Sequence, residues 1–318
     1  MKKTLKYFLP LIDLLSSPIV LVSLIILKFI SRLGMRKMFF SRNLFYLTGI
    51  YPVKDHYYEP LINPKHLYKS LSEERILSGI NWNIESQLEL LSSFNFENEL
   101  KKIPENYVSD TEFHYKNKSF ESGDAEFLYS IIRLKKPKRI IEIGSGHSTK
   151  IAKLAISKNT SIDTTYICNQ ICIEPYEMPW LEKIGVTVIR KRVEQIDIDF
   201  FRQLENNDIL FIDSSHMIRP QGDVLFEFLE LLPTLKKGVI VHIHDIFSPR
   251  DYLKEWIVEE NKFWNEQYLL EAFLSCNNDW EIIGSLNYLK HNHYDLLQSK
   301  LPLLTPEREP GSFYIMKK

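Results

Sequence analysis

Residues 140–149 place an apolar strand, a glycine turn and the start of a helix one after another, Ile-Ile-Glu-Ile-Gly-Ser-Gly-His-Ser-Thr. Gly144 and Gly146 let the backbone approach a ligand that a Cβ atom would exclude. A helix that starts at Ser148 or Thr149 points its free N–H groups back at the same place. The run therefore predicts a nucleotide-binding turn in a fold whose strand ends bind small molecules.

Apolar strands and helices alternate from residue 122 onwards. Strands are expected at residues 139–143, 171–173, 186–189, 209–212, 239–243, 280–288 and 313–316. Helices are expected at residues 124–134, 149–157, 176–184, 196–203, 222–232 and 263–273. This alternation predicts βαβ units, and therefore an α/β fold with a parallel sheet covered by helices on both faces.

The amino-terminal segment differs from the rest in composition. Residues 7–27 are almost continuously apolar, and the first 50 residues carry eight basic side chains against Asp13 alone. Ser17 followed by Pro18 predicts the start of a helix that ends near residue 30. A spanning helix, an interfacial or re-entrant anchor and a buried soluble helix all remain open, and a cleaved signal peptide is the weakest interpretation.

The basic side chains of this segment favour a membrane, because they would meet anionic lipid on its cytoplasmic side. We expect a membrane surface to contact residues 7–42, with the protein at the cytoplasmic face of a membrane or in the cytoplasm. Three parts are predicted: a membrane-associating segment at 1–45, a cap of helices and loops at 46–120, and the sheet domain at 121–318. The net charge of −1 gives no case for nucleic acid.

Three cysteines, Cys168, Cys172 and Cys276, provide neither a disulfide framework nor a second pair for zinc, so we expect reduced, structural thiols.

Residues 141–146, Ile-Glu-Ile-Gly-Ser-Gly, resemble motif I of the class I S-adenosylmethionine-dependent methyltransferases. Glu174 matches the ribose-binding acid of that fold, and residues 208–213 resemble its fourth-strand motif. The resemblance covers roughly residues 122–317 and implies a Rossmann-like, seven-stranded class I methyltransferase sheet, here with an amino-terminal helical extension. The cofactor-binding residues that it implies are Glu142, Gly144, Ser145, Gly146, Ser148, Glu174 and Asp213.

A nicotinamide dinucleotide fits this turn less well. Thr149 stands where the dinucleotide fingerprint has its third glycine. Glu174 lies 30 residues after Gly144, whereas that fingerprint places its acid about 20 residues on.

Acids and histidines follow the fourth and fifth predicted strands, at Asp213, His216, His244 and Asp245. Because these strands are expected to be neighbours, their carboxyl ends would bring the four side chains together beside the cofactor. The arrangement resembles the metal-dependent sugar O-methyltransferases, although His244 stands where that subgroup has an acid. We expect a catalytic set of His216, Asp213 and Asp245, with His216 as the base because an unperturbed histidine titrates near physiological pH. We also expect Asp213, His244 and Asp245 as ligands of a divalent metal such as Mg, Mn or Fe, since a mixed set of histidine and carboxylate ligands suits manganese or iron.

We therefore predict an S-adenosylmethionine-dependent methyltransferase that O-methylates a sugar hydroxyl on a glycan, a glycolipid or a small molecule. Two alternatives stay open at this point. One is an NAD-dependent oxidoreductase, and the other is a membrane-tethered scaffold that keeps the fold without turnover.

Overall fold

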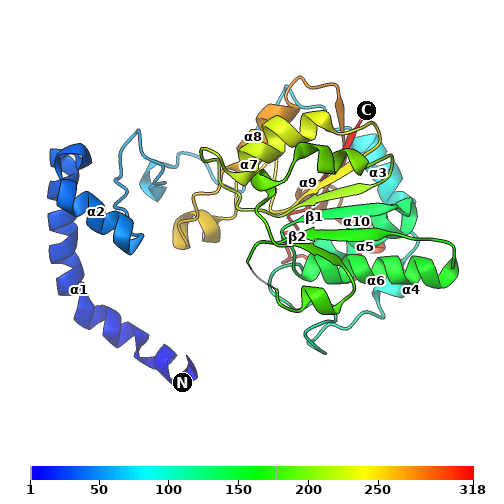
Figure 1. The fold of residues 1–318 in the computed structure, drawn as a ribbon, viewed down its shortest axis with the longest axis horizontal. Helices are drawn as coiled ribbons and strands as arrows, with labels where there is room; N and C mark the ends of the chain where they lie inside the picture. Colours follow the sequence, from blue (N-terminus) through cyan, green and yellow to red (C-terminus); the bar gives the residue numbers. More distant parts are fainter. Residues whose placement is uncertain (1, 177) are drawn as a thin grey trace. The chain divides into compact units, whose positions relative to one another are not determined.

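The computed structural model describes residues 2–176 and 178–318 (Figure 1). The chain divides into two compact units, Met1–His66 and Leu67–Lys318. The division lies inside the predicted cap region, so residues 67–120 belong to the same unit as the sheet.

Seven strands form one sheet in the second unit, in the order β3-β2-β1-β4-β5-β7-β6. The strands are β1 Arg139–Ile143, β2 Asn169–Ile173, β3 Thr187–Ile189, β4 Ile209–Ile212, β5 Ile240–Ile243, β6 Trp280–Ser285 and β7 Phe313–Lys317. Only β7 runs against its neighbours, since it pairs antiparallel with β5 and β6 while the other pairs are parallel. This architecture confirms the predicted seven-stranded, Rossmann-like sheet.

Alternate residues of each central strand face two separate cores. Ile140 of β1 faces one core, whereas Ile141 and Ile143 face the other. The first core is shared with α3 Ile84–Ser92, α4 Glu97–Leu100, α5 Asp124–Lys135, α6 His147–Ile162, α9 Leu286–Asn292 and α10 Tyr294–Lys300. The second is shared with α8 Glu266–Leu274 and with α7 Asp223–Leu225, which continues as a π-helical segment, Phe226–Leu231. Because both faces are buried, β4 is entirely apolar and β5 is apolar except for His242, whereas β1 contains the charged residues Arg139 and Glu142.

Two predicted elements of this unit are wrong. Where a helix was expected at residues 176–184, the described residues form turns and a short 3-10 helix, Leu181–Lys183. Pro179 disfavours the α-helical conformation of the residue before it, and Met178 has a φ of 60°. The strand predicted at residues 280–288 ends at Ser285, where α9 begins.

The first unit contains α1 Lys2–Leu33 and α2 Phe39–Thr48. The predicted helix start at Pro18 is wrong, because α1 continues through both Pro10 and Pro18. Ser17 does not cap a helix; its hydroxyl donates to the Asp13 carbonyl in the preceding turn, at 2.7 Å. The stretch Tyr7–Leu33 is long and apolar enough to cross a membrane, by length and composition, with a mean hydropathy of 2.2.

Candidate active site

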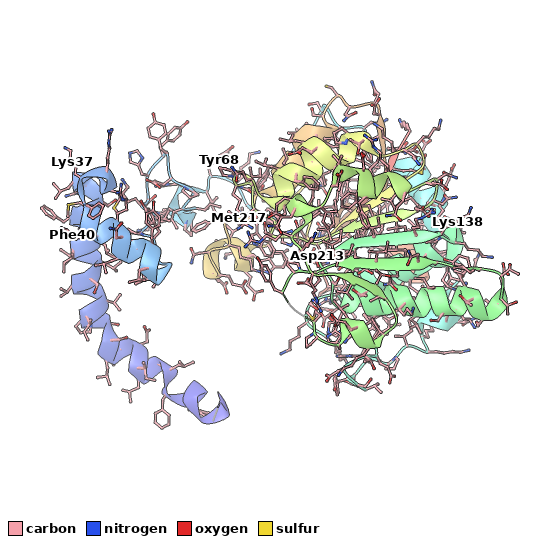
Figure 2. All side chains as sticks on the ribbon, in the orientation of Figure 1. Lys37, Phe40, Tyr68, Lys138, Asp213 and Met217 are labelled. Carbon is pink, nitrogen blue, oxygen red and sulfur yellow. The ribbon has the colours of Figure 1, made fainter. Side chains whose placement is uncertain are left out.

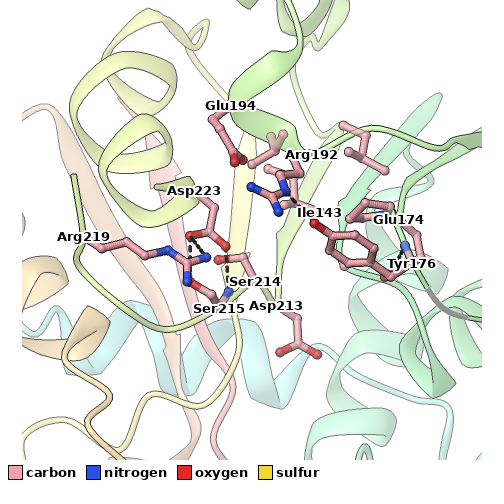
Figure 3. Close-up of a pocket in the computed structure, with 14 residues that line it drawn as sticks. Ile143, Glu174, Tyr176, Arg192, Glu194, Asp213, Ser214, Ser215, Arg219 and Asp223 are labelled. Atoms are coloured by element: carbon pink, nitrogen blue, oxygen red, sulfur yellow. Dashed lines mark hydrogen bonds and ion pairs between the residues drawn. The ribbon is translucent and has the colours of Figure 1, made fainter. Parts of the chain in front are cut away.

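A cavity of about 460 Å³ opens at the carboxyl ends of β1, β2 and β4 (Figure 3). Its wall includes Gly144, Glu174 and Asp213, which follow these three strands. In the strand order, β1 is the point where the chain turns from building one side of the sheet to building the other. Ligands of open α/β sheets bind at this switch point, so the cavity lies where the fold predicts a cofactor.

The two glycines of the turn have different structural roles. Gly144 has a φ of 78°, and a Cβ atom on it would lie 2.0 Å from the backbone oxygen of Asp213. Gly146 is extended, with a φ of −174°, and a Cβ atom there would meet nothing closer than Met178 Cε at 4.0 Å. Gly144 is therefore required by the backbone itself, because it lets the turns after β1 and β4 touch.

Glu142 holds the glycine turn from inside the protein. Its carboxylate accepts hydrogen bonds from Thr149 Oγ1 at 2.7 Å and from Gln170 Nε2 at 2.6 Å. Thr149 Oγ1 in turn accepts the backbone N–H of Gly146 at 3.1 Å. Burial raises the pKa of Glu142 to about 7, so this carboxyl titrates near neutral pH.

Glu174 forms the cavity wall next to the turn. Its two carboxylate oxygens accept the backbone N–H groups of Ser145, at 3.3 Å, and Tyr176, at 2.9 Å. The exposed Tyr176 ring lies further along the same wall, where Arg192 donates to its hydroxyl at 2.5 Å (Figure 3). An acid and an aromatic ring therefore lie on one side of the cavity, where they could contact a ribose and a base.

Asp213, His216 and Asp245 converge next to the cavity, and their ligand atoms all lie within 4.8 Å of one another. His216 Nε2 is 3.2 Å from Asp213 Oδ1 and 3.5 Å from Asp245 Oδ2. His244 Nδ1 lies 3.6 Å from Asp213 Oδ1 and 3.5 Å from Asp245 Oδ1. Asp213 belongs both to this cluster and to the cavity wall, so the two sites are continuous.

The His216 ring is fixed from its other side. Glu266, at the start of α8, lies 2.7 Å from Nδ1, so Nε2 is directed at the two aspartates. The Trp264 ring packs against the imidazole, with 4.3 Å between centroids. His216 and Asp245 both have left-handed backbone, with φ of 57° and 59°. Such conformations are uncommon outside glycine and are tolerated best by residues such as His and Asp.

The electrostatics of the cluster favour a cation. Burial opposes the charged imidazole of His216, but Asp213 and Glu266 outweigh it and hold its pKa well above its usual range. Burial opposes the charged form of His244 as well, and Asp245 and Asp213 again hold the pKa well above normal. Four carboxyl groups surround the two rings, those of Asp213, Asp245, Glu266 and, at 4.0 Å from His244, Asp124. Burial raises the pKa of Asp245 and of Glu266, so a positive charge at the cluster favours their ionised forms.

Comparison with known proteins identifies the family. Residues 141–246 match the model of a methyltransferase domain. An uncharacterized protein of Archaeoglobus fulgidus is 31% identical over 168 residues, which cover 48% of this chain and 74% of that protein. The chain belongs to the class I methyltransferases. A solved TDP-rhamnose 3'-O-methyltransferase of calicheamicin biosynthesis is 12% identical, with a TM-score of 0.38 over 73% of this chain and 93% of that one.

S-adenosylmethionine is the cofactor of this methyltransferase family, and family membership decides against the nicotinamide alternative. The cavity fits such a ligand, since pockets for small molecules measure about 300–1,000 Å³ and the acid Glu174 and the exposed ring of Tyr176 both line it. Of the residues predicted to bind the cofactor, those on the cavity wall are Gly144, Glu174 and Asp213. Glu142 and Ser148 are buried beneath the turn instead.

The other predicted residues of the methyltransferase are placed as follows. The three side chains placed closely enough to hold a metal ion are Asp213, His216 and Asp245, whereas the sequence had predicted His244 with the same two aspartates. His242 of β5 lies in the core, where its Nε2 is 2.8 Å from Ser312 Oγ. Asp208 lies at the opposite edge of the sheet, where it accepts the backbone N–H groups of Lys138 and Arg139.

Several site residues were not found from the sequence. Tyr176, Arg192 and Asp223 line the cavity, and each follows a strand end or begins a helix, so the strand-end rule could have suggested them. Glu266 and Trp264 contact His216 from 50 and 48 positions further along the chain. Nothing in the local sequence signals that contact.

Proposed function

We propose that this methyltransferase transfers the methyl group of S-adenosylmethionine to a sugar hydroxyl at the cluster of Asp213, His216 and Asp245. The observation that carries the proposal is that Asp213 belongs to both the cofactor cavity and the cluster. An acceptor bound at the cluster would therefore lie next to the cofactor. The bound cofactor supplies a methyl group already activated on a sulfonium, so the protein has to align the acceptor and remove its proton.

The cluster fits a divalent cation. Two carboxylates and one imidazole form a mixed donor set that suits manganese, iron or zinc, and magnesium would use the two aspartates. A cation held there would act as a Lewis acid and lower the pKa of a bound hydroxyl. The neighbouring hydroxyl groups of a sugar offer two oxygen ligands at once, which supports a sugar acceptor. The same residues resemble those of the metal-dependent sugar O-methyltransferases.

His216 has two candidate roles, and both would use the same atom, Nε2. Nε2 would either hold the cation or accept the proton of the acceptor hydroxyl. The contacts favour the first role, because Nε2 faces Asp213 and Asp245 at 3.2 and 3.5 Å, so a cation between the three groups would take the place of a proton on the ring.

The function is tested by methyl transfer from tritiated S-adenosylmethionine to the glycan and glycolipid fractions of the cells that make the protein. We expect label in an acid-stable O-methyl sugar. We also expect that treatment with a chelator abolishes the transfer and that Mn²⁺ restores it. Label in protein or nucleic acid would contradict the sugar acceptor, and full activity after chelation would favour His216 as base instead of the cation.

We also propose that α1 attaches the enzyme to the cytoplasmic face of a membrane. Its apolar stretch of 27 residues measures about 40 Å as a helix, which exceeds a hydrocarbon core of about 30 Å. None of the stretch is buried against the protein. Flotation of the full-length protein with vesicles tests this, and protein that remains at the bottom of the gradient would contradict it.

A further inference from the structure

The second helix of the first unit has an apolar stripe of its own. Phe40, Leu44 and Leu47 follow one another at helical spacing and therefore lie on one face of α2. Their exposed fractions are 82%, 58% and 82%, and none of the ten residues of α2 is buried. Within the described part of the chain, nothing covers this face.

This stripe does not extend the apolar surface of α1. Gly34 separates the two helices with a φ of 88°, and a short 3-10 turn, Met35–Lys37, follows it. A helix cannot continue through such a residue, so α2 runs in a direction of its own (Figure 1). With only ten residues, α2 is also far shorter than the roughly 20 that span a bilayer.

Positive charge surrounds the start of α2. Lys37, which Figure 2 labels, and Arg36 are exposed immediately before it, and Arg42 lies within it. The sequence has no acidic residue between Asp13 and Asp55. Aromatic side chains accompany the charges, since Phe39 and Tyr46 are also exposed. Basic residues next to an apolar stripe and aromatic rings are the features of a helix that lies in the surface of an anionic membrane.

We propose that α2 lies in the plane of an anionic lipid surface. In this arrangement, the stripe of Phe40, Leu44 and Leu47 is buried at the boundary between headgroups and acyl chains, while Arg36, Lys37 and Arg42 contact lipid phosphates. The proposal rests on the membrane attachment proposed for α1 and adds to it a preference for anionic lipid.

A pair of tryptophan probes tests the depth of α2 in the full-length protein. Phe40→Trp places the probe on the stripe, and Ser41→Trp places a matched probe about 100° around the helix. The wild-type signal is subtracted, since the chain has five native tryptophans. In vesicles of phosphatidylcholine and phosphatidylglycerol with brominated acyl chains, we expect at least twofold stronger quenching of the stripe probe. Equal quenching, or no quenching in protein that floats with the vesicles, overturns the proposal.

The preference for anionic lipid is tested with the Phe40→Trp protein, by changing the charge of the lipid and of the basic residues before α2. We expect at least twofold less quenching in vesicles of phosphatidylcholine alone, and the same loss when Arg36→Glu and Lys37→Glu are combined. The matched control, Lys101→Glu with Lys102→Glu in the second unit, is expected to change nothing. Quenching that is independent of lipid charge overturns the anionic preference. A blue shift of the probe's fluorescence in detergent without lipid, together with a crosslinked dimer, would show that the stripe packs against a second copy of the chain. That result also overturns the proposal that α2 lies in a lipid surface. Failure of the protein to float would instead overturn the attachment by α1.

Discussion

At the scale of single residues, the two glycines of the turn are needed for different reasons, one for backbone packing and the other for ligand binding. Gly144 is needed because the backbone of Asp213 occupies the space where a side chain would begin. Gly146 has no such neighbour in the described structure, so any need for it comes from the ligand. Substitution of Gly144 should therefore affect folding stability, whereas substitution of Gly146 should affect ligand binding, although the motif treats the two glycines alike.

We expect Gly144→Ala to destabilise the cofactor-free protein by about 2–4 kcal/mol, because it combines a left-handed backbone with a clash against main chain. Gly146→Ala is the matched control and is expected to change the free energy of unfolding by less than about 1 kcal/mol. Denaturant unfolding of both variants measures the difference. Equal stability of the two variants would contradict this account of the turn.

Glu142 makes stability depend on pH. A buried carboxyl with a pKa raised to about 7 binds its proton more tightly in the folded state than in the unfolded one. Its contribution to stability is therefore largest at low pH and is lost as the pH rises from about 4.5 to 7. We expect the wild type to lose about 2–4 kcal/mol relative to Glu142→Gln between pH 5 and pH 8. Parallel unfolding curves for the two proteins across this range would show that the group does not titrate there.

At the scale of elements, α8 fixes the loop that carries Asp213 and His216. Asn265, just before the helix, donates its N–H to the His216 carbonyl at 3.0 Å and accepts the Ile218 N–H at 2.6 Å. Glu266, in the first turn, fixes the imidazole. A carboxylate behind a histidine is the usual way in which proteins orient an imidazole toward a metal.

We expect Glu266→Ala to weaken Mn²⁺ binding by about 10–100-fold, since the ring loses its orientation. Glu266→Gln keeps an acceptor for Nδ1 and is expected to lose less affinity. Mn²⁺ titration followed by electron paramagnetic resonance measures this without an acceptor substrate. Wild-type affinity in Glu266→Ala, with the protein still folded, would rule out the positioning role.

The sequence predicted the elements whose signal is local. Residues 139–143 are rich in isoleucine and end at the glycine turn, residues 209–212 are an apolar run between two aspartates, and the structure gives both strands the same bounds. The helix expected at residues 176–184 failed because Pro179 restricts the backbone within an otherwise helical pattern. The approach of His216, Asp213 and Asp245 follows from strand order, which the resemblance supplied. The contact of Glu266 with His216 depends on how α8 packs, and no local pattern encodes that.

At the scale of the whole molecule, the two units differ in chemistry. The first 50 residues contain eight of the 40 basic residues and one of the 41 acidic residues. They also contain most of the exposed large apolar side chains. The second unit has two cores of its own and includes every residue that lines the cavity. The proposed catalysis and the proposed membrane attachment therefore depend on different parts of the chain.

This separation predicts that residues 67–318 fold and bind cofactor without the first unit. A unit with its own core is expected to fold alone, and no residue of the cavity or the cluster is removed. We expect affinity for S-adenosylhomocysteine within about twofold of that of the full chain, measured by calorimetry, and no flotation with vesicles. Because the exposed apolar helix is gone, the fragment should also stay monodisperse without detergent. Loss of cofactor binding in a folded fragment would mean that the first unit contributes to the cofactor site. Flotation of the fragment would mean that the second unit has a lipid-binding surface of its own.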